Sequence, residues 1–219
     1  MNIVFDFGAV LFTWQPAELV RRHFPHLTPT AQAAEDLARS LFHHEDWQGF
    51  DRGDHALDEA VARIAARLSL PGDALHDLLA PIGERLAPID ATVALLARLR
   101  ERRDAAGDLR LYYLSNMPAP YARVLEQRHE FIGWFDGGIF SGDVQLAKPQ
   151  AEIYRLLESR HGLEPARTVF IDDMQANVEA ARGLGWQAIH CTQPERLGAQ
   201  LQALLPQWMP AMGMAGSRR

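Results

Sequence analysis

The sequence is poor in cysteine, has no long apolar run and carries no excess of positive charge. Cys191 is the one cysteine among 219 residues, which excludes an intrachain disulfide and argues against a thiolate zinc site. No run reaches the roughly 18 apolar residues that a membrane-spanning helix needs. The N-terminus lacks the basic region and the long apolar core of a secretory signal peptide. We therefore expect a cytoplasmic protein with no membrane partner.

The net charge argues against nucleic acid as a partner. Acidic residues number 28 and basic residues 22, which gives a net charge of -6. Such a balance does not favour binding to a phosphate backbone. The composition, 47% hydrophobic and 23% charged, is typical of a globular protein. The length suits one large domain, or one domain with an insert.

The interpretation depends most on residues 2–12. The apolar run 3–5 is β-branched and aromatic, which predicts a buried strand. The run ends on Asp6, and Gly8 follows two positions later. A carboxylate at the end of a buried strand is costly unless it is paired, hydrogen-bonded or bound to a metal. Asp6 is therefore a candidate nucleophile or metal ligand, and a helix N-cap or turn residue is the alternative.

Helical patterns fill the chain from about residue 16 to residue 86, and strands alternate with helices after that. Helices are predicted to begin at 16 and 54, and to cover 33–42, the region around 75–79, 120–131 and 151–161. Further strands are predicted at 109–114, 139–141, 168–171 and 187–190. This order predicts an α/β fold, a Rossmann-like three-layer parallel sheet with an inserted all-helical cap domain. We expect the core to comprise 1–14 and 87–207, the cap 15–86, and a loose C-terminal tail 208–219.

Polar side chains follow three of the predicted strands, and a lysine opens a helix at the same edge of the sheet. They are Asp6, Ser115, Asn116, Asp172, Asp173 and Lys148. The carboxyl ends of parallel strands lie together, so these groups are expected to converge. The acids are suited to Mg²⁺, which prefers oxygen ligands. The metal, the hydroxyl and the ammonium would hold a phosphate while Asp6 attacks phosphorus.

These motifs resemble, in order, the four motifs of the haloacid dehalogenase-like hydrolase superfamily. The matching segments are 5–11 (FDFGAVL), 114–116 (LSN), 148–149 (KP) and 170–173 (FIDD). The pattern is most similar to the bacterial branch that includes the α-D-glucose-1-phosphate phosphatase. That branch also has glycine two residues after the nucleophile, and residues 47–53 (WQGFDRG) resemble its cap sequence.

The resemblance implies a role for each motif residue. Asp6 is the expected nucleophile and a metal ligand, and Gly8 would offer its backbone carbonyl to the metal. Asp173 is the expected main metal acid of the fourth motif, supported by Asp172 directly or through water. Mg²⁺ is the implied cofactor. The phosphate-binding and catalytic residues implied are Ser115, Asn116 and Lys148.

The sequence departs from the family pattern at Gly8. Most phosphatases of the superfamily have a second aspartate there, which acts as general acid and base. A cap residue could replace it, and the candidates are His43, His44, Glu45 and Asp51, unless these are ordinary surface residues. Arg52 is a candidate substrate-binding residue, or a partner of Asp51 or Asp54.

The expected function is a Mg²⁺-dependent phosphatase that hydrolyses a small phosphorylated metabolite through an aspartyl-phosphate. A sugar phosphate is one candidate substrate. One alternative is a 2-haloacid dehalogenase, which uses the same Asp nucleophile without a metal. Asp172 and Asp173 count against it, because two acids would repel a carboxylate substrate. The other alternative is a catalytically weak binding module, which Gly8 suggests.

Overall fold

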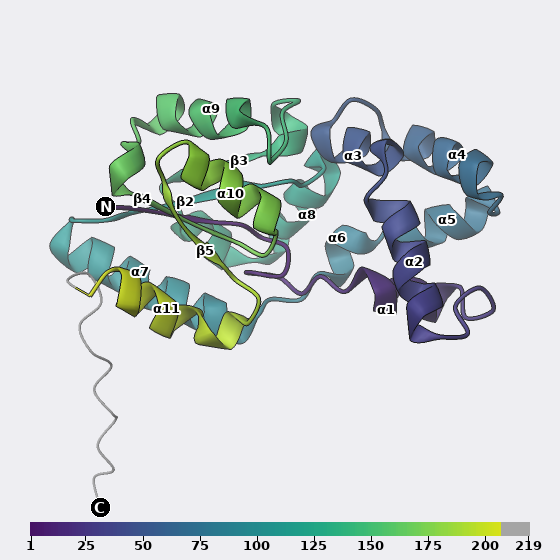
Figure 1. Ribbon diagram of the computed structural model, residues 1–219, viewed down its shortest axis with the longest axis horizontal. Coiled ribbons are helices and arrows are strands. Elements are labelled where there is room, and N and C mark those ends of the chain that lie inside the picture. Colours follow the sequence, from purple (N-terminus) through teal and green to yellow (C-terminus); the bar gives the residue numbers. More distant parts are fainter. Residues whose placement is uncertain (207–219) are drawn as a thin grey trace, which may run out of the picture.

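The computed structural model describes residues 1–206, which form a five-stranded parallel sheet with helices on both faces and a helical insert (Figure 1). The strand order is β3-β2-β1-β4-β5, so the first strand is central. The strands are β1 (Asn2–Phe5), β2 (Arg110–Ser115), β3 (Gly137–Phe140), β4 (Thr168–Asp172) and β5 (Gln187–His190). This confirms the predicted fold class. The predicted loose tail lies outside the described residues.

Alternating side chains of the strands face two separate helical layers. In β1, Ile3 and Phe5 join one apolar cluster and Val4 joins the other, as the two-residue period of a strand requires. The first layer contains α7 (Asp90–Ala106), α8 (Ala119–Arg128) and α11 (Leu197–Leu204). The second contains α9 (Ala151–His161) and α10 (Gln175–Gly183). Figure 1 shows α9 above the sheet and α7 and α11 below it.

The insert between β1 and α7 is entirely helical and lies to one side of the sheet (Figure 1). Its helices are α1 (Pro16–His23), α2 (Ala31–Phe42), α3 (Glu45–Arg52), α4 (Leu57–Leu68), α5 (Gly72–Leu79) and α6 (Ile82–Arg85). Their buried apolar side chains belong to the same cluster as one face of the sheet. The insert therefore packs on the core instead of standing apart from it. The predicted boundaries at residues 14 and 86 stay predictions.

Helix α3 was not expected as a separate element. It is only eight residues long and contains Gly49, which is a weak helix former. Its ends are fixed locally: His44 accepts a hydrogen bond from the amide of Asp46, and Gly53 closes the helix in the left-handed conformation. Tertiary packing of the buried Trp47 supplies the rest of its stability.

Short 3-10 turns complete the fold. They are η1 (Glu130–Trp134), η2 (Ser141–Asp143), η3 (Pro165–Arg167) and η4 (Pro194–Arg196). The helix expected over 120–131 ends at Arg128, and η1 continues the chain. Among the described residues, no helix is both long and apolar enough to cross a membrane.

Direct hydrogen bonds join the helical insert to the core. Ser141, fully buried in η2, donates its hydroxyl hydrogen to the backbone carbonyl of Asp51 and accepts from the amide of Met117 at 2.8 Å. On the other side of the contact, the Tyr121 hydroxyl donates to the carbonyl of Leu79 at 2.6 Å. These bonds hold the end of α3 against η2, which follows β3, and join the end of α5 to α8.

Gly53 is expected to be essential for this close packing. Its φ is +81°, and an added Cβ would lie 2.7 Å from the carbonyl oxygen of Gly142. Gly107 has a similar φ of +67° with nothing within 4 Å of an added Cβ. Gly107→Ala is expected to cost about 1 kcal/mol for the backbone conformation alone. Gly53→Ala should cost clearly more in urea unfolding. Equal costs would show that the contact with Gly142 is not tight.

Candidate active site

Lys148 is the centre of the candidate site, and it is the only lysine in the sequence. Its side chain is 1% exposed, and its Nζ lies 2.8 Å from Asp6 Oδ1 and 2.6 Å from Asp172 Oδ2. Burial by itself would lower the pKa of Lys148. The two carboxylates outweigh burial, so the pKa lies above its ordinary value. The ammonium is therefore a permanent cation between two buried acids.

The backbone of Lys148 is held by the side chain of Asn116. The Asn116 Oδ1 accepts from the Lys148 amide at 2.8 Å, and its Nδ2 donates to the Lys148 carbonyl at 3.0 Å. The strand β2 thus fixes the loop that carries the lysine. Both polar atoms of the Asn116 side chain thus contact Lys148. Asn116 also lines the cavity, and its role in binding substrate stays a prediction.

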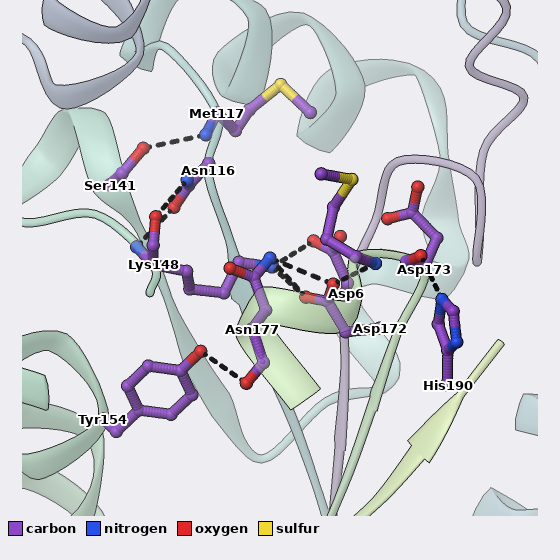
Figure 2. Close-up of polar contacts among 11 residues, drawn as sticks. Asp6, Asn116, Met117, Ser141, Lys148, Tyr154, Asp172, Asp173, Asn177 and His190 are labelled. Carbon is purple, nitrogen blue, oxygen red and sulfur yellow. Dashed lines mark hydrogen bonds and ion pairs between the residues drawn. The ribbon is translucent and has the colours of Figure 1, made fainter. Parts of the chain in front are cut away.

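Asp172 is completely buried and its carboxylate is surrounded by donors (Figure 2). Lys148 donates to Oδ2, and the amide of Met174 donates to Oδ1 at 2.8 Å. The Asn177 Nδ2 lies 3.0 and 3.1 Å from the two oxygens. The Tyr154 hydroxyl in turn donates to the Asn177 carbonyl at 3.0 Å. Asp172 is therefore well placed to orient Lys148.

Asp6 and Asp173 face the open side of the same cluster. Burial raises the pKa of Asp6 to about 6, against the opposing effect of Lys148. Burial and the neighbouring Asp6 raise the pKa of Asp173 to about 7. The buried hydroxyl of Ser115 hydrogen-bonds to Asp6. Figure 2 shows the Asp173 carboxylate pointing away from the network around Asp172.

The three acids could hold a divalent cation. One carboxylate oxygen from each of Asp6, Asp172 and Asp173 can be chosen so that all lie within 4.8 Å of one another. All three are hard oxygen donors, and two carry pKa values raised by burial, so a cation would relieve the crowding of negative charge. The donor set therefore fits a hard divalent cation such as Mg²⁺.

A cavity of about 360 Å³ opens above this cluster, between core and insert. The core supplies the polar floor, which includes Asp6, Gly8, Ser115, Lys148 and Asp173. Apolar side chains from both parts line the cavity as well, namely Trp14, Phe42, Trp47, Ile82, Leu86, Met117, Tyr121 and Met174. Sequence reasoning missed the contributions of Trp14, Met117 and Tyr121, because only the folded chain brings them to the site.

The structure separates the cap residues that the sequence left as alternatives. His44 is used as the N-cap of α3, and Glu45 pairs with Arg52. The Arg52 guanidinium also bonds to Asp54, with its Nη2 2.7 Å from the Asp54 carboxylate. Arg52 lines the cavity, and two carboxylates already occupy its Nε and Nη2 donors.

Two of the four candidates, His43 and Asp51, line the cavity. His43 is exposed at its edge. Asp51 is half-buried at the end of α3, and burial raises its pKa to about 8 despite a hydrogen bond from Trp47.

Replacing Lys148 with methionine is expected to destabilise the protein by about 3–5 kcal/mol at pH 8, because the buried acids lose their counterion. The loss should be smaller at pH 5. The folded-state pKa of Asp6 already lies near 6, above its ordinary 3.8, and without the ammonium it rises further. The folded variant then binds more protons than the unfolded chain, so stability falls as pH rises through that pKa.

Urea unfolding at both pH values measures this effect. The double variant Lys148→Met/Asp172→Asn is the matched control, because it removes one of the two acids and should regain stability at pH 8. A loss that is equal at both pH values and unchanged in the double variant would contradict the electrostatic account.

Comparisons with known proteins find one similar sequence and two similar folds among the matches described below. The sesquiterpene phosphatase astK of Aspergillus oryzae is 28% identical over 202 residues, 92% of this chain and 95% of that protein. Two solved structures share the fold. The HAD family enzyme bt-2542 of Bacteroides thetaiotaomicron, in complex with magnesium and inorganic phosphate, has a TM-score of 0.65 at 18% identity, covering 86% of this chain and 92% of that one. The L-2-haloacid dehalogenase of Xanthobacter autotrophicus has a TM-score of 0.62 at 21% identity, covering 92% and 82%.

A family model is decisive for classification. The model described as haloacid dehalogenase-like hydrolase matches residues 3–185, which contain all four motifs, the insert and every residue of the acid–lysine cluster. The predicted family and the predicted hydrolase class are thereby confirmed. The chain belongs to the haloacid dehalogenase-like hydrolases.

Proposed function

We propose that this enzyme is a Mg²⁺-dependent phosphatase that hydrolyses a small phosphoric monoester through an aspartyl-phosphate on Asp6. The observation that carries the proposal is the position of Asp6. Its carboxylate lies at the end of the central strand, faces the cavity, and is 2.8 Å from a permanently charged lysine. A carboxylate held in this way can attack phosphorus, because the neighbouring cation stabilises the charge of the transferring group.

The residues around Asp6 bind the phosphoryl group or position the residues that bind it. Lys148 and the Ser115 hydroxyl are in position to bind the oxygens of the phosphoryl group. Asn116 positions Lys148 through its backbone, and Asp172 positions its ammonium. Proximity to fixed donors lowers the barrier because little reorganisation is needed during transfer.

Asp6, the Gly8 carbonyl and Asp173 are the proposed metal ligands, and all three residues line the cavity. Asp172 does not line the cavity and accepts hydrogen bonds on both oxygens. We therefore assign it a supporting role and not direct binding of the metal. When bound, Mg²⁺ would neutralise charge on the phosphoryl oxygens and on the clustered acids.

The same features favour a phosphatase over the two alternatives. A dehalogenase binds a carboxylate substrate, which three clustered acids with a single lysine would repel. A decayed binding module would not need Lys148 fixed by two carboxylates and an amide side chain. The relative with the nearly full-length match is named a phosphatase, which supports the same choice.

Phosphate release from p-nitrophenyl phosphate should require Mg²⁺, and Asp6→Asn should abolish nearly all of it while the protein stays folded. Chelation of the metal should stop turnover reversibly. Phosphate release that persists in Asp6→Asn, or that is insensitive to chelation, would defeat the proposal. Chloride release from a 2-haloacid would instead support the dehalogenase.

Two neighbouring acids provide a matched control for the metal assignment. Asp173→Ala should raise the Mg²⁺ concentration needed for half-maximal activity much more than Asp172→Ala does. Asp172→Ala should mainly lower the maximal rate, because it frees Lys148. If the two variants shift the Mg²⁺ requirement equally, the assignment of Asp173 as the main ligand is wrong.

The lining of the cavity bears on the leaving group. A sugar phosphate is the candidate from sequence resemblance, but the walls above the polar floor include Trp14, Phe42, Trp47 and Tyr121. Such walls stabilise apolar groups by removing their surface from water, at about 25 cal/mol per Å². The relative from Aspergillus oryzae is named a sesquiterpene phosphatase, and a sesquiterpene is an apolar group, which supports the same choice. We therefore propose a phosphate ester with an apolar organic group.

A C15 prenyl monophosphate is expected to give a kcat/KM at least about tenfold above that of glucose 1-phosphate, because each buried methylene contributes about 0.8 kcal/mol. Steady-state rates for the two substrates, with a short alkyl phosphate as reference, measure this. Trp14→Ala should reduce the rate for the prenyl ester selectively. A higher kcat/KM for glucose 1-phosphate would contradict the apolar ester and favour the sugar phosphate that the sequence suggested.

A further inference from the structure

We propose that Asp51, carried by the cap helix α3, is the general acid and base that the core lacks at Gly8. This inference rests on the proposed phosphatase function and adds the residue that moves the proton. Position 8 offers no side chain, and among the acids that line the cavity only Asp51 comes from the insert. Asp6 and Asp173 are already committed to the nucleophile and metal roles.

The location of Asp51 is fixed from both sides. Its backbone carbonyl accepts a hydrogen bond from the buried Ser141 of the core, and its carboxylate accepts one from the Trp47 side chain. Gly53, two residues on, packs against the backbone of Gly142. The carboxyl group is thus held at the cap–core contact and faces the cavity.

The surroundings of Asp51 suit an acid that must be protonated at neutral pH. Burial raises its pKa to about 8 and outweighs the hydrogen bond from Trp47 and the charge of Arg52, which both lower it. The charge of Asp6 adds to the effect of burial, and Lys148 opposes it. The Arg52 guanidinium is itself paired with Glu45 and Asp54. Tyr121, across the cavity wall, feels the charge of Asp51 but carries none at neutral pH.

The chemistry balances over two half-reactions. In the first, an Asp6 oxygen bonds to phosphorus, the bond from phosphorus to the leaving oxygen breaks, and Asp51 gives its proton to that oxygen, which leaves as an alcohol. In the second, water bonds to phosphorus, Asp51 takes back a proton from this water, and the bond from Asp6 to phosphorus breaks. Inorganic phosphate leaves, and both acids return to their starting states.

The other candidates fit less well. His44 and Glu45 are occupied in capping α3 and in pairing with Arg52. His43 lines the cavity but is exposed on its edge, and no hydrogen bond fixes its ring among the described contacts. Only Asp51 is both inside the cavity and held by the core.

The test measures kcat/KM against leaving-group pKa for a series of aryl and alkyl phosphates with the full chain and Mg²⁺, because kcat/KM reports the half-reaction in which the alcohol leaves. The wild type should show a shallow dependence. Asp51→Asn keeps an acceptor for Trp47 but has no proton to give, so it should steepen the dependence and lose about 10²–10⁴-fold in kcat/KM on alkyl phosphates. It should lose much less kcat/KM on p-nitrophenyl phosphate, whose leaving group needs no proton.

A burst experiment gives a second readout. In Asp51→Asn, the first half-reaction with p-nitrophenyl phosphate should remain fast while hydrolysis of the aspartyl-phosphate slows. One p-nitrophenol per protein should then appear before the steady state. Asp54→Asn, an exposed acid of the same loop that also pairs with Arg52, is the matched control and should show neither change.

Restoring the missing acid at its usual position tests the idea from the other side. An added Cβ at Gly8 would meet only Trp14, at 3.9 Å, so a side chain fits there. The double variant Gly8→Asp/Asp51→Asn should regain the shallow dependence.

Three results would overturn the assignment of Asp51. They are a steep dependence in the wild type, an equal loss of kcat/KM on all substrates in Asp51→Asn, and the absence of a burst in that variant. A wild type that hydrolyses no phosphoric monoester would refute the proposed function itself, which is a separate outcome.

Discussion

The buried ion pairs of Lys148 hold the candidate site together. Asp6 and Asp172 lie side by side at the carboxyl ends of the adjacent parallel strands β1 and β4. The register of these strands brings both carboxylates within hydrogen-bond distance of the same ammonium. Two such charges without a counterion would be costly in a buried environment. One ammonium, held in place by Asn116, makes the arrangement tolerable and leaves Asp6 facing the cavity. The stability of this corner and its chemistry therefore depend on the same contact.

The sheet and the helical insert contribute different parts of the cavity. The core alone supplies the proposed nucleophile, the lysine and the acids proposed to bind a metal, all on the floor of the cavity. The insert adds apolar walls and Asp51. It is bonded to Ser141, which follows β3, and to Tyr121 of α8, which follows β2. Because the same few bonds fix both Asp51 and the wall, substrate choice and proton transfer would change together if this contact moved.

Local sequence patterns predicted the elements well, and long-range contacts account for what they missed. The apolar run before Asp6 and the periodicity of α9 carry their own signals, and both elements were found where they were expected. The convergence of Asp6, Ser115, Lys148 and Asp173 followed from the parallel sheet alone. The helix α3 was missed because its stability comes from packing and from Gly53 lying against Gly142. The use of the Asn116 side chain also depends on a residue 32 positions away, and no local pattern encodes such a contact.

The most direct test of the account is mass spectrometry of the protein quenched in acid during turnover of p-nitrophenyl phosphate with Mg²⁺. The peptide that contains Asp6 should carry one phosphoryl group, and hydroxylamine should remove it, as expected for an acyl phosphate. The same peptide from Asp6→Asn should carry none. Turnover without a phosphoryl group on Asp6, or with the group on another residue, would contradict the central claim.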